Sequence, residues 1–227
     1  MTRTRPCLQS RQQHPSSLPL PDSSLTYSYQ VANGHGLPHD PFKAIIAPRP
    51  IGWIASKSLN GVANLAPYSF FNAFNNAPPI IGFASVGYKD SVKNIEETGE
   101  FCWSMATQPL AEAMNNTSKP VAEDVSEFEL AGLEQGVPHQ VNVPFVAASP
   151  VSMECKLTQI VQLTNTAQQP LDTWVVFGQV VAVHIAHSHL KDGAFQLVEA
   201  QPIMRAGGPG DYFSISAENG FFMGRPT

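Results

Sequence analysis

The side chains best suited to bind a ligand are concentrated between residues 64 and 91, in the stretch NLAPYSFFNAFNNAPPIIGFASVGYKDS. Lys89 stands directly before a predicted helix that begins at Asp90 and Ser91, and Ser85 lies at the end of the strand predicted before it. The free N–H groups of a helix start and a neighbouring cation together form a good binding site for phosphate. The pattern therefore predicts a phosphate site for a nucleotide-like ligand.

A simpler interpretation of the same residues is structural. The side chain of Asp90 or Ser91 could cap the helix, and Lys89 could be a solvated surface charge. The local sequence leaves both interpretations open.

Aromatic residues in the same stretch could form the wall of a ligand site. Phe70, Phe71 and Phe74 have the spacing of an ordinary core cluster. Ser69 and Asn72 lie beside them and add hydrogen-bonding groups, which favours a wall that contacts a polar ligand.

Near the C-terminus, Arg205 and Tyr212 flank a pair of glycines at positions 207 and 208. These residues could simply form a turn that leads into a last strand. Alternatively, the glycines let the backbone approach a ligand while Arg205 supplies a positive charge.

Other kinds of chemistry find little support. His184, His187 and His189 are close in sequence, but side chains three positions apart on a strand point to opposite faces, and the last two fall in a predicted turn. We therefore expect no metal site there. No GxSxG motif or other ordered nucleophile accompanies the serines and aspartates, so a hydrolase is unsupported.

The composition is that of a globular protein. The chain has 227 residues, of which 43% are hydrophobic and 14% charged, and its net charge is −5. This mild acidity argues against nucleic acid or an anionic membrane as a partner. No apolar run approaches the roughly 20 residues needed to span a bilayer. The three cysteines include no CxxC pair, so we expect a cytoplasmic protein without disulfides or structural zinc.

The first part of the chain differs in composition from the rest. Residues 1–24 are rich in Ser, Gln, Pro and Arg, which predicts a disordered N-terminal tail. An organelle targeting peptide is an alternative, although prolines interrupt any amphipathic helix there. We expect one domain over residues 25–220 and a short C-terminal tail over residues 221–227.

The elements that must position the candidate residues are mostly strands. Strands are predicted over residues 51–57, 62–66, 80–86 and 101–105. The first two are joined by a hairpin turn at Leu59-Asn60-Gly61. Short helices are predicted over residues 91–98, 110–114 and 125–130.

Two further strands carry the strongest β signal. Residues 151–158 alternate between apolar and polar, and the phase slips at residues 159–160, which indicates a bulge. Residues 173–185 are almost continuously apolar, so both faces of this strand need cover, and a second subunit could supply part of it. Long strands, a hairpin turn and few helices together predict an antiparallel barrel, which leaves no edge strand exposed.

Seven segments occur in order along the chain: PRPIGWIAS (48–56), NLAPYSFFNAF (64–74), KDSVKNIEETGEF (89–101), EFELAGL (127–133), ASPVSMEC (148–155), FGQVVAVHI (177–185) and PIMRAGGPGDY (202–212). Each is weakly specific alone, but together they resemble the flavin reductase-like family with an FMN-binding split barrel. The resemblance covers residues 27–215. It implies a mainly β fold, an antiparallel Greek-key split β-barrel with a few short helices. It also implies a homodimer with one FMN near each side of the subunit interface.

The resemblance further implies which residues would contact the cofactor. The flavin ring would lie against residues 64–72, where backbone N–H groups could bond its polar edge. The phosphate would lie at the start of the predicted helix, where Ser91 replaces the family's usual Thr and keeps the hydroxyl. Arg49 matches a position near the flavin, although it could equally be a structural ion-pair partner. The expected cofactor-binding residues are Arg49, Trp53, Asn64, Ala66, Ser69, Phe70, Phe71, Asn72, Ser85, Lys89, Asp90, Ser91, Arg205 and Tyr212.

The activity implied by the resemblance is that of an NAD(P)H:flavin oxidoreductase, in which NADH or NADPH delivers hydride to N5 of the flavin. The segment from Arg205 to Tyr212 would border the nicotinamide, and His184 is a candidate proton donor. A monooxygenase or another acceptor would receive the electrons. An alternative is an FMN-containing electron carrier that receives electrons from a protein partner. A further alternative is a dimeric binding module that has lost flavin.

Overall fold

The computed structural model describes residues 25–226, which fall into two units. The first unit ends at Asp40, and its described part contains the short 3₁₀ helix η2 (Val31–Asn33). Within this unit the hydroxyl of Tyr27 donates a hydrogen bond to the carbonyl of His35 over 2.8 Å. The predicted tail over residues 1–24 lies outside the described residues. We expected the domain to begin at residue 25, whereas the unit that contains the strands begins at Pro41.

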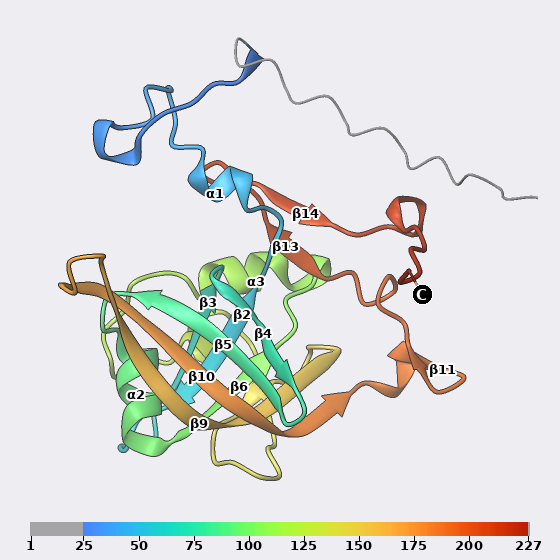
Figure 1. Ribbon diagram of the computed structural model, residues 1–227. Coiled ribbons are helices and arrows are strands. Elements are labelled where there is room, and N and C mark those ends of the chain that lie inside the picture. Colours follow the sequence, from blue (N-terminus) through green and yellow to red (C-terminus); the bar gives the residue numbers. More distant parts are fainter. Residues whose placement is uncertain (1–24, 227) are drawn as a thin grey trace, which may run out of the picture. The chain divides into compact units, whose positions relative to one another are not determined.

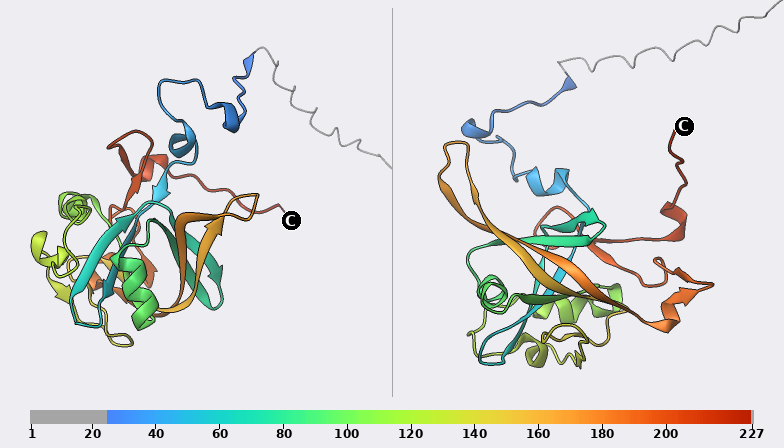
Figure 2. Two further views of the ribbon diagram at one scale, coloured as in Figure 1. Left: turned by 90° about the vertical axis from the view of Figure 1, so that its left-hand side faces the viewer. Right: turned by 60° about the horizontal axis from the view of Figure 1, so that its bottom comes forward.

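A seven-stranded antiparallel sheet forms the body of the second unit, in the order β3-β2-β6-β9-β10-β5-β4 (Figure 1). Its strands are β2 (Gly52–Lys57), β3 (Ala63–Tyr68), β4 (Phe71–Asn76), β5 (Pro79–Val86), β6 (Glu100–Ser104), β9 (Val151–Thr164) and β10 (Pro170–Ile185). The two end strands, β3 and β4, are joined only by Ser69 and Phe70, so the sheet curls until its edges meet (Figure 2). The rings of Tyr68 and Phe83 lie 4.5 Å apart across this junction. The mainly β split barrel expected from the sequence is therefore confirmed.

The hairpin between β2 and β3 has the predicted turn. The amide of Ser58 donates to the carbonyl of Val62 over 2.9 Å, and Gly61 has a φ of +88°, which a residue without Cβ adopts at little cost. The second predicted strand continues two residues further than expected and ends at Tyr68.

The predicted bulge between β9 and β10 is present one residue earlier than expected. Leu157 pairs with Gly178 and Gln159 pairs with Phe177, so Thr158 is the extra residue. Its Oγ1 atom donates to the carbonyl of Phe177 over 3.1 Å. A Cβ atom at position 178 would lie 2.2 Å from the ring of the fully buried Phe101, so the bulged region requires glycine there.

The helices are short, as expected. They are α1 (Phe42–Ile45), α2 (Asp90–Thr98), α3 (Ala111–Asn116) and α4 (Glu127–Leu130). Val92 and Ile95 of α2 are fully buried in the barrel core, and Gly99 ends the helix with a φ of +74°. In the part of the chain that the structure describes, no helix is long and apolar enough to cross a membrane.

Smaller elements surround the barrel. A three-stranded sheet contains β1 (Arg49–Pro50), β13 (Ile203–Arg205) and β14 (Tyr212–Ser214). Two-stranded sheets pair β7 (Gln135–Gly136) with β8 (Phe145–Val146), and β11 (Leu190–Lys191) with β12 (Ala194–Phe195). Further 3₁₀ turns are η3 (Gln108–Leu110), η4 (His187–His189) and η5 (Ala217–Asn219). Residues 221–226 lie outside helices and strands.

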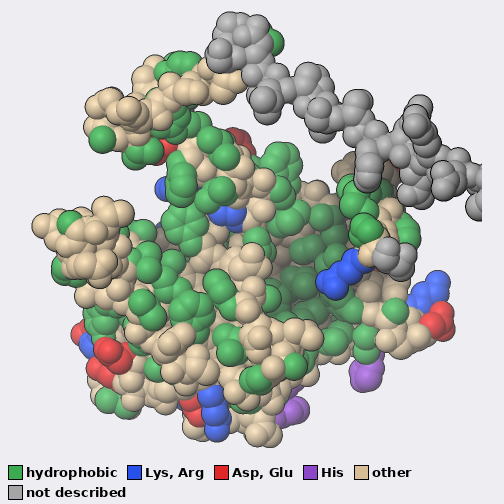
Figure 3. Space-filling model, in the orientation of Figure 1, with side chains coloured by type: hydrophobic (Ala, Val, Ile, Leu, Met, Phe, Trp, Pro, Cys, Tyr) green, Lys and Arg blue, Asp and Glu red, His purple; other side chains and the backbone are tan. Residues whose placement is uncertain are grey.

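Within one chain, other residues cover the side chains of β10 only in part. Val176 and Val180 are buried, whereas Val183 is 52% exposed. Phe74 on β4 and Val86 on β5 are also exposed. Figure 3 shows apolar side chains gathered over this side of the barrel. The predicted need for cover on both faces of the strand is thus met only in part by the chain itself.

Candidate functional site

The start of α2 is open to a ligand. Lys89 occupies the N-cap position in an extended conformation, and no side chain caps the helix. The hydroxyl of Ser91 instead donates to the Oδ1 atom of Asn64 over 2.8 Å. The alternative in which Asp90 or Ser91 caps the helix is therefore not what the structure shows. N–H groups at the start of α2 remain available to an anion.

A cavity of about 620 Å³ lies at this helix start. Its lining residues are Asn64, Ala66, Pro67, Tyr68, Lys89, Asp90, Ser91, Thr117, Ser118, Lys119, Pro120, Val121 and Glu127. Lys89 and Lys119 come from segments 30 residues apart, and they place two positive charges around one space. The carboxylates of Asp90 and Glu127 partly oppose these charges.

A second, smaller cavity of about 290 Å³ adjoins the first. It is lined by Ile51, Pro67, Tyr68, Ser69, Asn115, Ser118, Arg205, Pro209, Gly210 and Tyr212. Pro67, Tyr68 and Ser118 belong to both linings, so the two cavities share a wall. Three of the predicted residues, Ser69, Arg205 and Tyr212, meet in the second cavity.

A buried polar network stands behind the first cavity. The Nδ2 atom of Asn64 donates to both carboxylate oxygens of Glu127 at 3.0 Å, and the amide of Leu65 donates to the same carboxylate over 2.9 Å. Burial raises the pKa of Glu127, and the bonds from Leu65 and Asn64 offset part of this rise. Because its polar atoms are occupied, the side chain of Asn64 organises the wall and leaves ligand contact to its neighbours.

The outer edge of β3 lacks free backbone donors at Leu65 and Pro67. The carbonyl of Ala63 and the amide of Leu65 bond to side chains of Ser126 and Glu127, so odd-numbered residues of this end strand face away from β2. The next such residue is Pro67, which has no N–H group. The expected backbone donors are thus missing from this part of residues 64–72, because the amide of Leu65 is bonded to Glu127 and Pro67 has none.

Tyr68 carries an unusual hydroxyl. The residue is only 8% exposed, and its hydroxyl has no hydrogen-bond partner among the described residues. Ser85 and Ser91 lie beside it, but their protons are directed to the carbonyl of Gly87 and to Asn64, over 2.9 and 2.8 Å. Burial raises the pKa of Tyr68, so the phenol is protonated and can donate.

Trp53 was expected near the flavin, but its side chain is fully buried and reaches neither cavity. Its Nε1 atom donates to the Oγ1 atom of Thr117 over 3.0 Å, and Thr117 in turn donates to the carbonyl of Met114 over 2.7 Å. Trp53 therefore supports the segment that carries Ser118 and Lys119.

Several other predicted residues also lie away from the two cavities. Arg49 is buried and donates to the carbonyls of Lys43 and, over 3.2 Å, Ala206, with Phe70 5.9 Å from its guanidinium. The ring of Phe71 stacks on Trp103 at 5.7 Å.

Two polar residues of the predicted site are likewise turned to local partners. Asn72 is exposed and bonds the following amide, and Ser85 is fully buried. Within one chain, the structure therefore does not bring Arg49, Phe70, Phe71, Asn72 or Ser85 into the linings.

Arg205 shapes the loop that closes the second cavity. Its guanidinium donates to the carbonyls of Asp211 over 2.7 Å and Pro209 over 2.8 Å. The same group lies 5.0 Å from the ring centre of Tyr212, a cation–π contact. Arg205 therefore adds a positive charge to the cavity and also holds its wall.

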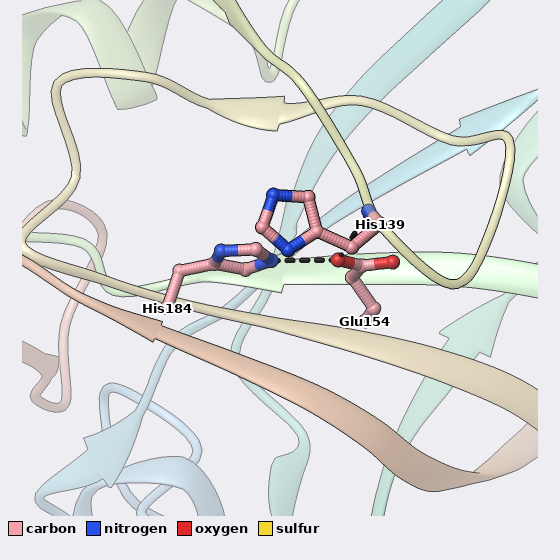
Figure 4. Close-up of side chains that lie close together, drawn as sticks. All are labelled: His139, Glu154 and His184. Atoms are coloured by element: carbon pink, nitrogen blue, oxygen red, sulfur yellow. Dashed lines mark hydrogen bonds and ion pairs between the residues drawn. The ribbon is translucent and has the colours of Figure 1, made fainter.

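His184 belongs to a different cluster, with Glu154 and His139 (Figure 4). Its Nε2 atom lies 2.6 Å from Oε1 of Glu154, and its ring stacks on Phe145. The two oxygens of Glu154 accept four hydrogen bonds, because the amides of residues 139–141 also donate to them. A metal ion would have to displace the bond from His184. His187 and His189 lie apart in the exposed turn η4.

The carboxylate of Glu154 is stabilised in its charged form. Burial alone raises its pKa, but the hydrogen bonds from the backbone and from His184 outweigh burial and leave the pKa below its ordinary value. The buried thiols of Cys102 and Cys155 are inert by contrast, because burial raises their pKa.

Comparison with known families agrees with this architecture. The family described as "Flavin reductase like domain" matches residues 46–200. The chain belongs to the flavin reductase-like family. A relative from Halalkalibacterium halodurans is 34% identical over 188 residues, which cover 80% of this chain and 88% of the relative. A relative from Aquifex aeolicus is 34% identical over 72% of this chain and 83% of its own length.

Solved structures of the same fold include functionally described proteins. Nitrilotriacetate monooxygenase component B from Bacillus cereus is 27% identical, with a TM-score of 0.75, and the match covers 92% of this chain and all of that one. The 2-nitrobenzoate 2-nitroreductase of Pseudomonas fluorescens is 28% identical, with a TM-score of 0.71 over 82% of this chain and 89% of that one.

Several residues that line the cavities of this flavin reductase-like protein were not predicted from the sequence. They are Pro67, Tyr68, Glu127 and the run from Thr117 to Val121. Lys119 follows Asn-Thr-Ser and precedes a proline, which marks a loop, and no local pattern says that this loop faces α2. Tyr68 was in the predicted stretch, but only its burial shows that its hydroxyl is unpaired.

Proposed function

We propose that the protein is an NAD(P)H:flavin oxidoreductase that binds FMN with its phosphate at the start of α2. The observation that carries the proposal is the uncapped start of α2, which lies in a cavity that Lys89 and Lys119 both line. A phosphate dianion suits backbone N–H groups and two cations. Membership of the flavin reductase-like family supports the same ligand.

The residues present fit such a group. The hydroxyl of Tyr68 is buried beside the helix start, and it is a hydrogen-bond donor without an acceptor among the described residues. The carboxylate of the opposing acid Glu127 already accepts hydrogen bonds from Asn64 and Leu65, so its charge has partners within the wall. At the outer edge of β3, Pro67 lines both cavities and has no N–H group, so this position offers only its carbonyl to the N–H of a flavin ring.

When bound, FMN supplies the two-electron chemistry that passes hydride equivalents from a nicotinamide to an acceptor. The chain's part is to bind and orient. Lys89 and Lys119 hold the phosphate end, and Asp90 and Ser91 present the helix start. The second cavity, with Arg205 and Tyr212, would take part of the NADH or NADPH. His184 is bonded to Glu154 outside both linings, so the proposal gives it no role as proton donor.

A homodimer is part of the proposal. The side of the barrel formed by β4, β5 and β10 leaves Phe74, Val86 and Val183 more than half exposed. Covering them with a second copy would remove this apolar surface from water. Light scattering on the purified protein should give twice the chain mass of 24.6 kDa, and a monomer at micromolar concentration would contradict the dimer.

The test is an absorbance spectrum followed by a turnover assay. Protein reconstituted with FMN should bind it stoichiometrically and should oxidise NADH or NADPH when free FMN is added as acceptor. Lys89→Ala should lose FMN affinity, whereas Lys156→Ala on the exposed face of β9 should keep it. A yellow protein that oxidises neither nucleotide would instead be an FMN-containing electron carrier for a monooxygenase or another partner. A protein that takes up no FMN would contradict the proposal.

A further inference from the structure

The direction of one hydrogen-bond chain behind the first cavity can be assigned. A carboxylate only accepts, so the amide nitrogen of Asn64 must face Glu127, at 3.0 Å from each oxygen. The Oδ1 atom of Asn64 then faces Ser91, whose hydroxyl has a single proton. Ser91 therefore directs this proton to Asn64, over 2.8 Å, and turns only lone pairs toward the cavity.

This direction is unsuited to an anion. A phosphate oxygen also carries lone pairs, so it gains nothing from the Ser91 hydroxyl in this orientation. Ser85 offers no substitute, because its hydroxyl donates to the carbonyl of Gly87 over 2.9 Å. Tyr68 lies next to Ser91, and its hydroxyl proton has no acceptor among the described residues.

We propose that Tyr68 is a positioning residue for the phosphate of a bound nucleotide and acts through Ser91. When the phosphate arrives at the start of α2, the Ser91 hydroxyl rotates from Asn64 to the phosphate, and Tyr68 donates its proton to the Ser91 oxygen. A small shift of the two side chains brings them into hydrogen-bonding geometry. The inference rests on the proposed function, because it takes the phosphate of FMN as the ligand.

The rotation leaves no buried group unpaired. The Oδ1 atom of Asn64 keeps a second donor, the hydroxyl of Ser56 at 3.2 Å. Ser56 in turn accepts from the Nδ2 atom of Asn94 over 3.3 Å. The hydroxyl of Tyr68, unpaired before binding, gains an acceptor. Ligand binding therefore satisfies a buried donor that the free protein leaves unsatisfied, which favours the bound state.

The variant Tyr68→Phe tests the inference, because it removes only the hydroxyl and keeps the ring against Phe83. The dissociation constant for FMN should rise about tenfold. This is the loss expected when Ser91, which binds the charged phosphate, loses one hydrogen bond from Tyr68. Riboflavin has the same ring and no phosphate, so its dissociation constant should stay within about twofold. Tyr88→Phe is the matched control, because the Tyr88 hydroxyl bonds Glu96 and the residue lines neither cavity.

A double-mutant cycle shows whether Tyr68 acts through Ser91. In a Ser91→Ala background, Tyr68→Phe should have no further effect on FMN affinity. Full additivity of the two losses would overturn the inference. So would an equal loss for FMN and riboflavin, because that pattern indicates a purely structural role.

The ligand-free protein provides a second readout. Tyr68→Phe removes a buried unpaired hydroxyl, so the free variant should melt at the same temperature as the wild type or higher, yet FMN should raise its melting temperature less. If the variant does not fold, wild-type protein with ¹³C-labelled tyrosine provides the test by NMR. Exchange of the Tyr68 hydroxyl proton with water should slow on adding FMN and stay unchanged on adding riboflavin. Equal exchange rates with the two ligands would overturn the inference. Wild-type protein that binds FMN and riboflavin equally would also overturn it while leaving the proposed activity standing.

Discussion

The Nε1 atom of Trp53 donates a hydrogen bond to the Oγ1 atom of Thr117 over 3.0 Å, and so links the beginning of β2 to the wall of the first cavity. Trp53 is fully buried, whereas Ser118 and Lys119 directly after Thr117 face the cavity. A residue that cannot touch a ligand thus decides where two candidate ligand contacts lie.

Trp53→Phe should weaken FMN binding indirectly. The smaller ring cannot donate to Thr117 and leaves a gap in the core, so the segment from Thr117 to Val121 loses its support. We expect the free energy of unfolding to fall by about 2–4 kcal/mol and the dissociation constant for FMN to rise several-fold, as measured by denaturation and by fluorescence titration. Trp174→Phe, which lies outside both linings, serves as the control for FMN affinity. Unchanged FMN affinity in Trp53→Phe would show that Trp53 does not support the site.

Lys119→Ala should reduce FMN affinity about as much as Lys89→Ala, because both ammonium groups line the same cavity. The loss for each should be roughly tenfold in low salt and smaller in high salt, since screening weakens exposed charges. Riboflavin affinity should change little. Titrations at two salt concentrations, with Lys156→Ala as the control, check this prediction. If Lys119→Ala alone had no effect, the phosphate would lie nearer to α2 than to the 117–121 segment.

Gly178→Ala should destabilise the barrel without touching the site. The new Cβ would lie 2.2 Å from one ring atom of Phe101 and 3.2 Å from Cys155, and both residues are fully buried. Overpacking of this kind costs about 1–3 kcal/mol. Urea denaturation should show this loss, while Gly210→Ala, where a Cβ meets nothing within 4 Å, should leave stability nearly unchanged. Equal stabilities of the two variants would show that the bulge relaxes freely.

Glu154→Gln should destabilise the protein most at neutral pH. A glutamine has one acceptor oxygen, so it cannot satisfy the amides of residues 139–141 and His184 together, and the expected loss is about 2–4 kcal/mol. The folded-state pKa of Glu154 lies below its ordinary value, so the stabilisation by the carboxylate is complete above the unfolded-state pKa, about 4.3. It is lost as the pH falls through the folded-state pKa.

The difference in unfolding free energy between wild type and Glu154→Gln should therefore be constant from about pH 6 to 8 and should shrink below about pH 4. Denaturation curves at several pH values measure it. Glu129→Gln, an exposed change on α4, is the control. A difference that stays constant down to pH 3 would mean that the carboxylate is already protonated or does not titrate in this range.

Much of the fold follows from local patterns. The hairpin at Gly61, the bulge near Thr158 and the end of α2 at Gly99 were each predicted within one or two residues, because alternation, turn chemistry and caps depend on neighbours in sequence. The prediction of a phosphate site at Lys89 and the helix start had the same local origin.

The candidate site was predicted less completely. Among the expected contacts, Trp53 and Arg49 are buried supports, and Phe71 packs on Trp103. A match of residue type along the chain cannot distinguish a side chain that lines a cavity from one that lies directly behind its wall. That distinction depends on burial, which is a property of the packed barrel.

The sequence by itself determined six of the seven strands of the large sheet, the helices α2, α3 and α4, and the cation at the start of α2, because each depends on residues within a few positions; it missed β4 and α1. Only the tertiary structure decided that Lys119 lines the same cavity as Lys89, that Glu127 orients Asn64 from 63 positions away, and that the hydroxyl of Tyr68 is buried without a partner. The physical reason is that hydrogen-bond direction and desolvation depend on every group around an atom. In this barrel those groups come from strands and loops far apart in the chain.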